Sequence, residues 1–373
     1  MDVTLQLPAR VGRSSWAVAG CLGAFLLVAG LTRPAQGQVM ALASVDRLNR
    51  QLAGCVVDYT HNHGQDRRLF SPILGRPRDL YVYLPPGYSR STAYPLILYL
   101  HMASVDEHVF VGSSFLVQLD EMIRRGEFPP VIVACPDGVI NGENRLRAAH
   151  SFYVNGCGGR FQDHLVQEVV PFLMQSYSIR PERQAHAVFG LSAGGFGAIG
   201  MGLKYRSFFG AVVTMAGPAN MRYCTCSGDC LAEFDPVTYR WSEGFNPNQV
   251  VGRFYFGLKP VFAKKYARPI FGSGPAVAGR LRRENPADLL FTTDLQPGQL
   301  DIYMNVPGRD NYNFDDQARS FAWLAAQKGV QVTVEADPKG RHNLPYFRNN
   351  HVSAYRWLSQ HLLPPAPLVP ADH

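Results

Sequence analysis

Charged residues are scarce in this sequence. Lys, Arg, Asp and Glu make up 17% of the 373 residues, while 46% are hydrophobic. This balance excludes a predominantly disordered chain, and the length is sufficient for a sizeable core. The formal net charge of +7 is a small surplus, so we expect no nucleic-acid partner.

The sequence offers no convincing membrane span near its N-terminus, because the uncharged apolar stretch at 15–31 is short for one. This stretch follows the basic residues Arg10 and Arg13 and precedes small residues at positions 35 and 37, which is typical of a cleaved signal peptide. We therefore predict a signal peptide at 1–37 and a secreted, periplasmic or cell-envelope protein without stable membrane insertion. An uncleaved anchor helix is the alternative. A lipid-modified Cys21 is less favoured, because the apolar run continues past it.

Cysteines are few, and one of the seven lies in the predicted signal peptide. An exported chain that retains an even number of cysteines favours disulfides, whose connectivity the sequence leaves open. Cys135 ends the apolar run VIVAC, where a buried free thiol is the alternative. A zinc site is disfavoured, because Cys224–Cys230 lacks C-x-x-C spacing and a second distant pair. The candidates for disulfides are Cys55, Cys135, Cys157, Cys224, Cys226 and Cys230.

Acidic residues are missing between Glu182 and Asp229. This excludes a dinucleotide site on the G-x-G-x-x-G motif at 195–200, because such a site needs an acidic residue about twenty positions further on to bind the ribose. The motif also begins six residues after the predicted strand end at Phe189. A phosphate-binding loop follows its strand directly. We expect no organic cofactor and no metal.

Strand-like and helix-like segments alternate through most of the remaining chain, which predicts an α/β fold with a mostly parallel sheet and helices on both faces. Residues 219–298 interrupt the alternation with many Gly and Pro residues. We predict that they form an irregular, lid-like insertion over the carboxyl ends of the strands, where ligands bind in such folds. The predicted strands are 79–84, 96–100, 131–135, 185–189, 211–215, 300–306 and 330–336. The predicted helices are 115–125, 163–177, 193–205, 314–328 and 347–363. The predicted organisation is a lead-in segment 38–67, one domain 68–365 and a C-terminal tail 366–373.

The segment Gly190–Gly194 matches G-x-S-x-G, the turn that presents a nucleophilic serine between a strand and a helix. The match alone is weak in a chain with 35 glycines, but the flanking strand-like and helix-like patterns support it. Ser192 is the predicted nucleophile. The backbone N–H of Ala193 is then placed to bind an oxyanion at the helix N-terminus. The later glycines of the motif become packing residues of a helix close to its sheet.

A nucleophilic serine needs a histidine to take its proton and a carboxylate to orient that histidine. Asp310 follows a predicted strand on a loop and is the predicted acid. Asp315 and Asp316, in the first turn of the next helix, remain alternatives.

His342 follows the last predicted strand and is the predicted base. His351 is the rival, but it falls inside the last predicted helix. Met102, after the strand 96–100, is expected to supply a second oxyanion N–H. We assign the neighbouring His101 a structural role.

The sequence resembles the esterase D, feruloyl esterase and antigen 85 group of α/β-hydrolases. The segments that carry the resemblance are LYVYLPPGYSRSTAYPLILYLH, VIVACPDG, FQDHLVQEVVPFLMQSYSI, AHAVFGLSAGGFGAIGMGLKYRSFFGAVVTMAG, GRD and GRHN, in that order. The resemblance implies the α/β-hydrolase fold, carboxylic ester chemistry and the triad Ser192, Asp310 and His342. Many members of the group have Met where this chain has Ala193, and His-Gly-Gly where it has His101-Met102-Ala103.

We therefore expect an exported serine esterase that acts through an acyl-enzyme on a small-molecule or polymer-linked ester. One alternative is acyl transfer to a sugar hydroxyl, as in antigen 85-like proteins. The other is a catalytically silent binding protein on a hydrolase fold. The acyl and alcohol specificity and the oligomeric state are not readable from the sequence.

Overall fold

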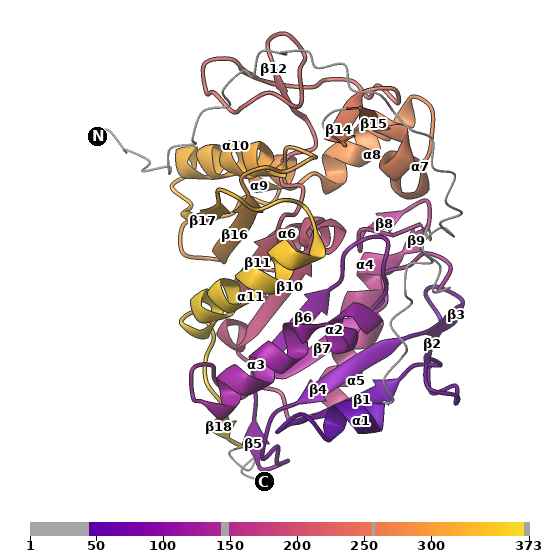
Figure 1. Cartoon of the computed structure of the whole chain (residues 1–373), viewed down its shortest axis with the longest axis vertical. Coiled ribbons are helices and arrows are strands. Elements are labelled where there is room, and N and C mark those ends of the chain that lie inside the picture. The colour runs from indigo at the N-terminus through magenta and orange to yellow at the C-terminus, as the bar shows by residue number, and fades with distance from the viewer. Residues whose placement is uncertain (1–44, 143–148, 256–257, 369–373) are drawn as a thin grey trace, which may run out of the picture.

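The computed structural model describes residues 45–142, 149–255 and 258–368, so the predicted signal peptide lies outside the described residues. Its centre is an eight-stranded sheet (Figure 1). In spatial order the strands are β1 (Cys55–Tyr59), β4 (Leu80–Leu84), β7 (Ile132–Pro136), β6 (Leu96–Leu100), β10 (His186–Leu191), β11 (Ala211–Met215), β16 (Asp301–Pro307) and β17 (Val332–Asp337). In this order the six strands from β7 to β17 run parallel, whereas β4 runs antiparallel to both of its neighbours.

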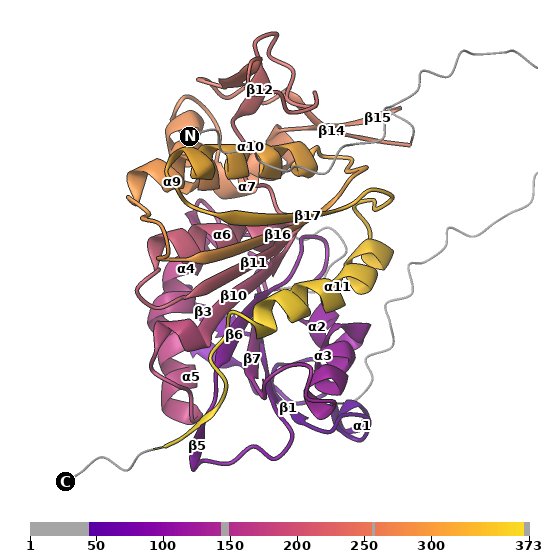
Figure 2. The same ribbon diagram turned by 90° about the vertical axis from the view of Figure 1, so that its left-hand side faces the viewer.

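Helices cover both faces of the sheet, as Figure 2 shows from the side. One face carries α4 (Phe161–His164), a π-helical turn (Leu165–Val169), α5 (Val170–Ser176), α6 (Ala193–Lys204), α9 (Pro286–Thr292) and α10 (Phe314–Gln327). The other face carries α1 (Val45–Asn49), α2 (His108–Gly112), α3 (Ser114–Arg124) and α11 (Leu344–Ser359). The predicted fold class is therefore confirmed.

The central strands read as continuous apolar runs because both of their faces are covered. All residues of β10 are buried. Alternate side chains serve opposite faces: Val188 packs into the core on the α6 side, whereas Phe189 packs into the core on the α11 side. Each face of the sheet thus has its own hydrophobic core.

The predicted strands agree with the observed ones to within two residues at each end. The edge strand β1 is not among the predicted strands, because it falls in the predicted lead-in segment 38–67. The helix predicted at 163–177 is broken up by the π-helical turn at Leu165–Val169. The last helix begins earlier than position 347, since the Asn343 side chain caps it by accepting from the Tyr346 N–H.

Residues 219–298 are less irregular than predicted. They form two hairpins and three helices at one end of the molecule, the upper end in Figure 1. The hairpins are β12 (Tyr223–Thr225) with β13 (Tyr239–Trp241) and β14 (Val250–Phe254) with β15 (Lys259–Phe262). The helices are α7 (Lys264–Phe271), α8 (Ala276–Glu284) and α9. Their length and amphipathic pattern were obscured by the Gly and Pro residues between them.

Short paired segments complete the described chain: β2 (Leu69–Ser71) with β3 (Arg76–Arg78), β8 (Asn155–Gly156) with β9 (Gly159–Arg160), and β5 (Thr92–Ala93) with β18 (Ala366–Pro367). The last pair joins the beginning of the predicted C-terminal tail to the domain. No helix among the described residues is long and apolar enough to cross a membrane.

The expected disulfides are absent from the structure, in which the six cysteines of the described chain are free thiols. Cys135 is a fully buried thiol in β7 whose Sγ donates to the Glu107 carbonyl. The Cys224 and Cys230 thiols face carbonyls of different strands, those of Arg240 and Val250. Within the described residues, no group of three or more His, Cys, Asp and Glu side chains is arranged to hold a metal ion.

Candidate active site

Ser192 lies at the sharp turn between β10 and α6 with φ of 49°, in the region that L-residues rarely adopt. Its N–H donates to the Met215 carbonyl of the neighbouring strand at 2.9 Å, which ties the turn to the sheet. The two flanking glycines are required by space. A Cβ on Gly190 would lie 2.2 Å from the Gly194 oxygen, and one on Gly194 would lie 2.1 Å from the Leu100 oxygen. The turn therefore presents the Ser192 side chain with its backbone fixed on both sides.

The remaining glycines of α6 are of two kinds. A Cβ on Gly195 would lie 2.3 Å from Thr214 Oγ1, and one on Gly197 would lie 2.7 Å from the Phe152 oxygen, so both are packing residues as expected. Gly200 differs, because its Cβ would only touch Leu289 at an ordinary 3.8 Å. The G-x-G-x-x-G pattern is thus partly a requirement of close packing and partly incidental.

The structure brings the three residues predicted as the triad together. His342 Nε2 lies 2.9 Å from Ser192 Oγ, and His342 Nδ1 lies 3.0 Å from Asp310 Oδ2. The other Asp310 oxygen accepts the Tyr312 N–H at 2.7 Å, which fixes the orientation of the carboxylate. Each residue follows a different parallel strand: Ser192 follows β10, Asp310 follows β16 and His342 follows β17. The carboxyl ends of these parallel strands lie at one edge of the sheet, which explains how positions 150 and 32 residues apart meet.

The alternative acids lie elsewhere. Asp315 and Asp316 are fully buried in the first turn of α10, and Asp316 lies 3.8 Å from Arg319. Asp310, rather than either of them, holds His342.

The rival base His351 is a core residue of α11. Its Nδ1 donates to the Phe347 carbonyl, its Nε2 accepts from the Tyr99 hydroxyl at 2.7 Å, and its ring stacks on Phe115. Burial lowers the pKa of His351 to about 3, so this side chain is neutral.

The His342 ring is held by aromatic side chains as well as by Asp310. Tyr312, Phe314 and Phe347 each present a ring to it at centroid distances of 5.2 to 5.6 Å and steep angles. The imidazole side chain is only 12% exposed. This packing restricts the rotation of the ring and limits water around the bond between His342 and Ser192.

The two predicted oxyanion donors, Ala193 and Met102, lie at the cavity that contains Ser192. Ala193 is the first residue of α6, so its N–H has no intrahelical acceptor and lies at the positive end of the helix. The position of Gly194, against the carbonyls of Leu100 and His101, brings the start of α6 onto the loop that contains Met102. Met102 and Ala193 both line the same cavity as Ser192.

His101 is a structural residue, as expected. Its Nε2 accepts the Gly138 N–H at 2.8 Å, so its Nδ1 carries the proton and donates to the Met102 carbonyl at 2.9 Å. The ring is fully buried. His101 thereby fixes the backbone that follows Met102.

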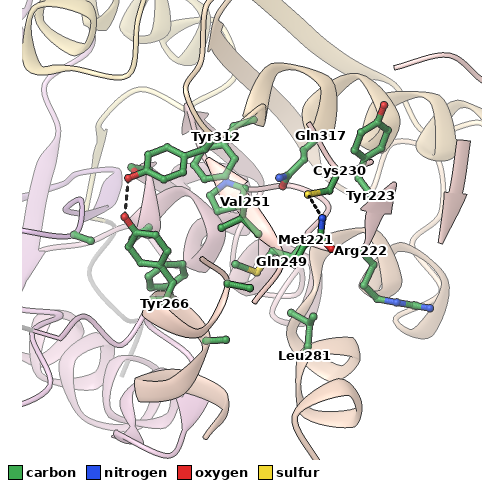
Figure 3. A pocket seen from close by; sticks show the side chains of 18 of the residues that line it. Met221, Arg222, Tyr223, Cys230, Gln249, Val251, Tyr266, Leu281, Tyr312 and Gln317 are labelled. Atoms are coloured by element: carbon green, nitrogen blue, oxygen red, sulfur yellow. Dashed lines mark hydrogen bonds between the residues drawn. The ribbon is translucent and has the colours of Figure 1, made fainter. Parts of the chain in front are cut away.

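A cavity of about 480 Å³ opens beside Ser192 and His342. Figure 3 shows that its walls converge from the segment 219–298 and from Tyr312 and Gln317. Most of the lining is apolar, and Gln249, Gln317 and Arg222 supply polar groups. The apolar and aromatic side chains include Phe152, Met221, Phe245, Val251, Phe254, Tyr266, Phe271, Leu281, Tyr312, Phe314 and Phe347. Such a lining suits an apolar group of a bound molecule.

Sequence reasoning did not identify the pair Tyr266 and Tyr312, whose hydroxyls lie 2.6 Å apart across the cavity wall. Burial and then the neighbouring Tyr266 raise the pKa of Tyr312, so its hydroxyl stays protonated. The pair joins α7 to the loop that contains Asp310. The only signal in the sequence was a tyrosine two positions after Asp310.

The fold and this arrangement define an α/β protein with a serine, histidine and aspartate at the carboxyl ends of parallel strands. Residues 71–360 match the family model described as putative esterase. The chain belongs to this putative esterase family, which confirms the resemblance found in the sequence.

Relatives and solved structures agree with this family. Over 158 residues, or 42% of this chain, the sequence is 28% identical to Esterase Rv1288 of Mycobacterium tuberculosis. The match spans 32% of that relative's own length.

Two solved structures are similar in fold. An S-formylglutathione hydrolase from Agrobacterium tumefaciens superposes over 84% of this chain and 97% of its own, with a TM-score of 0.58 and 14% identity. A ferulic acid esterase superposes over 83% of this chain and 99% of its own, with a TM-score of 0.55 and 16% identity.

Proposed function

We propose that this protein hydrolyses carboxylic esters through an acyl-enzyme on Ser192. The observation that supports this most strongly is the continuous hydrogen-bonded series from Asp310 through His342 to Ser192 Oγ. Membership of the putative esterase family agrees with it.

In the proposed reaction, Ser192 Oγ attacks the ester carbonyl while His342 Nε2 takes its proton. Asp310 keeps the His342 Nδ1–H oriented and stabilises the imidazolium. The N–H groups of Ala193 and Met102 bind the oxyanion of the tetrahedral intermediate. His342 then protonates the leaving alcohol, and a water molecule deprotonated by His342 releases the acid from Ser192.

The cavity supports the proposal that the protein binds its ester substrate by an apolar acyl group. Aromatic and aliphatic side chains form most of its wall, and its volume of about 480 Å³ exceeds what an acetyl group needs. We expect kcat/KM to rise with acyl length over a series of p-nitrophenyl esters from acetate to octanoate. A preference for acetate would contradict this assignment.

The central test is Ser192→Ala. We expect kcat on p-nitrophenyl butyrate to fall by a factor of about 10⁴ or more, because no covalent intermediate forms. Ser207→Ala, an exposed serine shortly after the same helix, is the control and should keep full activity. Retained activity in Ser192→Ala would refute the assignment. Absence of Ser192 labelling by a fluorophosphonate probe in the native chain would favour a silent binding protein.

Transfer of the acyl group to a sugar hydroxyl would use the same acyl-enzyme and is the alternative fate of the intermediate. Product analysis with and without an added sugar distinguishes it from hydrolysis. A free acid as the sole product in both cases supports the esterase.

We also infer export from the pattern of residues 1–37. Expression in a secreting host should yield a mature chain whose measured mass corresponds to an N-terminus at Gln38. A chain that retains Met1 and remains in the cytoplasm would contradict this inference.

A further inference from the structure

Positive charge is concentrated in one part of the segment 219–298. Residues 244–283 contain eight Lys and Arg residues and no Asp or Glu, whereas the whole chain has a formal charge of +7. The rest of the chain is therefore close to neutral. A surplus of positive charge of this size within forty residues favours an anionic partner.

The same residues also expose large apolar side chains at the β14–β15 hairpin. Leu258 is 85% exposed and Tyr255 is 70% exposed, and Phe262 is partly exposed next to them. These side chains alternate with cations, since Lys259 lies over the Tyr255 ring and Lys264 over the Phe262 ring. Figure 2 shows that the hairpin projects beyond the helices at this end of the molecule.

The lysines of this region contact only neighbouring polar or aromatic groups of the described chain: Lys264 Nζ donates to Asn248 Oδ1 at 2.9 Å, and Lys259 and Lys265 lie over tyrosine rings. Arg253, Lys259, Lys264, Lys265 and Arg268 are exposed, and none of them forms an ion pair with a described residue. Arg282, further along the chain, is paired with Glu243. The five unpaired cations and the three exposed apolar side chains together are called the hairpin surface.

We propose that the hairpin surface docks the protein on anionic lipid bilayers. Lys and Arg side chains beside exposed aromatic and aliphatic groups match the two layers of a bilayer interface, the charged headgroups and the upper acyl chains. A polyanionic polymer would attract the cations but would leave Leu258 and Tyr255 without a partner. The exposed Tyr255 and Leu258 side chains therefore favour lipid over a charged glycan.

The hairpin connects this surface to the cavity. Val251 and Phe254 of β14 line the cavity beside Ser192, while Tyr255 and Leu258 point away from it into solvent. Docking thus places the cavity mouth close to the membrane, where apolar esters partition. This inference is independent of the proposed chemistry, because docking requires no turnover.

The test measures sedimentation of the full chain with vesicles of phosphatidylcholine alone and with phosphatidylglycerol added. We expect binding to the anionic vesicles, weakened by salt. The triple variant K259E/K264E/K265E should bind at least about tenfold more weakly. The matched control R50E/R90E/R356E reverses three exposed cations at other sites and should bind like the parent. All variants carry the same N-terminal segment, so differences in binding arise from the exchanged residues.

The double variant Y255S/L258S separates lipid from polymer. It should lose vesicle binding while keeping all eight cations. If it binds anionic vesicles as well as the parent does, or if the parent binds soluble dextran sulfate more tightly than vesicles, the surface is a polyanion site and the lipid proposal is wrong. Hydrolysis of soluble p-nitrophenyl acetate should be unchanged in these variants, and Ser192→Ala should bind vesicles normally. Docking and catalysis can therefore fail separately.

Discussion

The sheet and the segment 219–298 line the same cavity but contribute different things to it. The sheet positions Ser192, Asp310 and His342, the groups that we propose react, on loops or turns that follow parallel strands. The segment 219–298 supplies apolar wall residues from short hairpins and helices, and it exposes several large side chains to solvent. The difference teaches that the proposed chemistry and the proposed selectivity depend on separate parts of the molecule, so each should respond to its own substitutions.

The largest effect on the sheet side is expected from Asp310→Asn. The amide cannot stabilise the His342 imidazolium and permits the wrong tautomer, so kcat should fall about 10⁴-fold with little change in KM. Steady-state kinetics on p-nitrophenyl butyrate measure this. Asp301→Asn, at the opposite end of β16, is the control and should be unaffected. A loss below about tenfold in Asp310→Asn would place the functional acid elsewhere.

The effect of replacing a glycine of α6 by alanine should depend on the space available for the added Cβ. Gly194→Ala places a Cβ against the Leu100 carbonyl and should lower the free energy of unfolding by about 3 kcal/mol, together with activity. Gly200→Ala has room for its Cβ and should raise that free energy by about 0.5 kcal/mol, because alanine favours the helix. Urea unfolding of both variants measures the difference. Equal losses would show that the packing of α6 does not require its glycines.

Acid should destabilise the sheet and its helices rather than the segment 219–298, which contains no histidine. Burial lowers the pKa of His351 to about 3 and that of His108 to about 4, so the folded state holds fewer protons than the unfolded state below about pH 6.5. Stability is therefore lost as the pH falls from about 6.5. Each such histidine lowers the free energy of unfolding by up to about 2 kcal/mol at pH 5 relative to pH 7.

Urea unfolding at pH 7 and pH 5 measures this loss. The free energy of unfolding at pH 7 exceeds that at pH 5, and in His351→Gln this difference should shrink by about 2 kcal/mol. The variant itself is less stable than the parent at pH 7. Gln360→Ala, an exposed residue just beyond α11 that does not titrate, is the control and should keep the full difference. An unchanged difference in His351→Gln would contradict the role of burial.

The smallest effect is expected from the cavity wall. Phe245→Ala removes apolar contact with a long acyl chain, so kcat/KM for p-nitrophenyl octanoate should fall about tenfold while that for the acetate stays within about twofold. Phe291→Ala, an exposed phenylalanine of the same segment, is the control. A parallel loss on both esters would show that the wall positions the reacting groups.

The same division explains what the sequence could predict. The buried strands β10 and β16 read as apolar runs and the edge strand β17 as an alternating segment, so the residues after them, Ser192, Asp310 and His342, could be placed by their order. The helices α7 and α8 are not among the predicted helices because Pro269 and Gly279 lie inside them, and because Lys and Arg residues interrupt their short apolar patterns. Their shape depends on contacts between residues far apart, which no local pattern records. The cavity therefore could not be derived, although the turn that presents Ser192 could.

The edge strand β1 was missed for a related reason. Only Val56 and Asp58 of its five residues are buried, so it lacks the continuous apolar run of the central strands. The disulfides were expected from the even number of cysteines and the predicted export, which carry no information on the geometry of thiols such as Cys224 and Cys230.

One consequence follows from the burial of α6. Every residue from Ala193 to Leu203 is buried, so we expect the hydrogen-bonded amides of this helix beyond its first turn to exchange with solvent deuterium only when the whole domain opens. The presentation of Ser192 then lasts as long as the folded state itself. We therefore expect the half-life of thermal inactivation to be set by the rate of global unfolding, and not by local changes at the site.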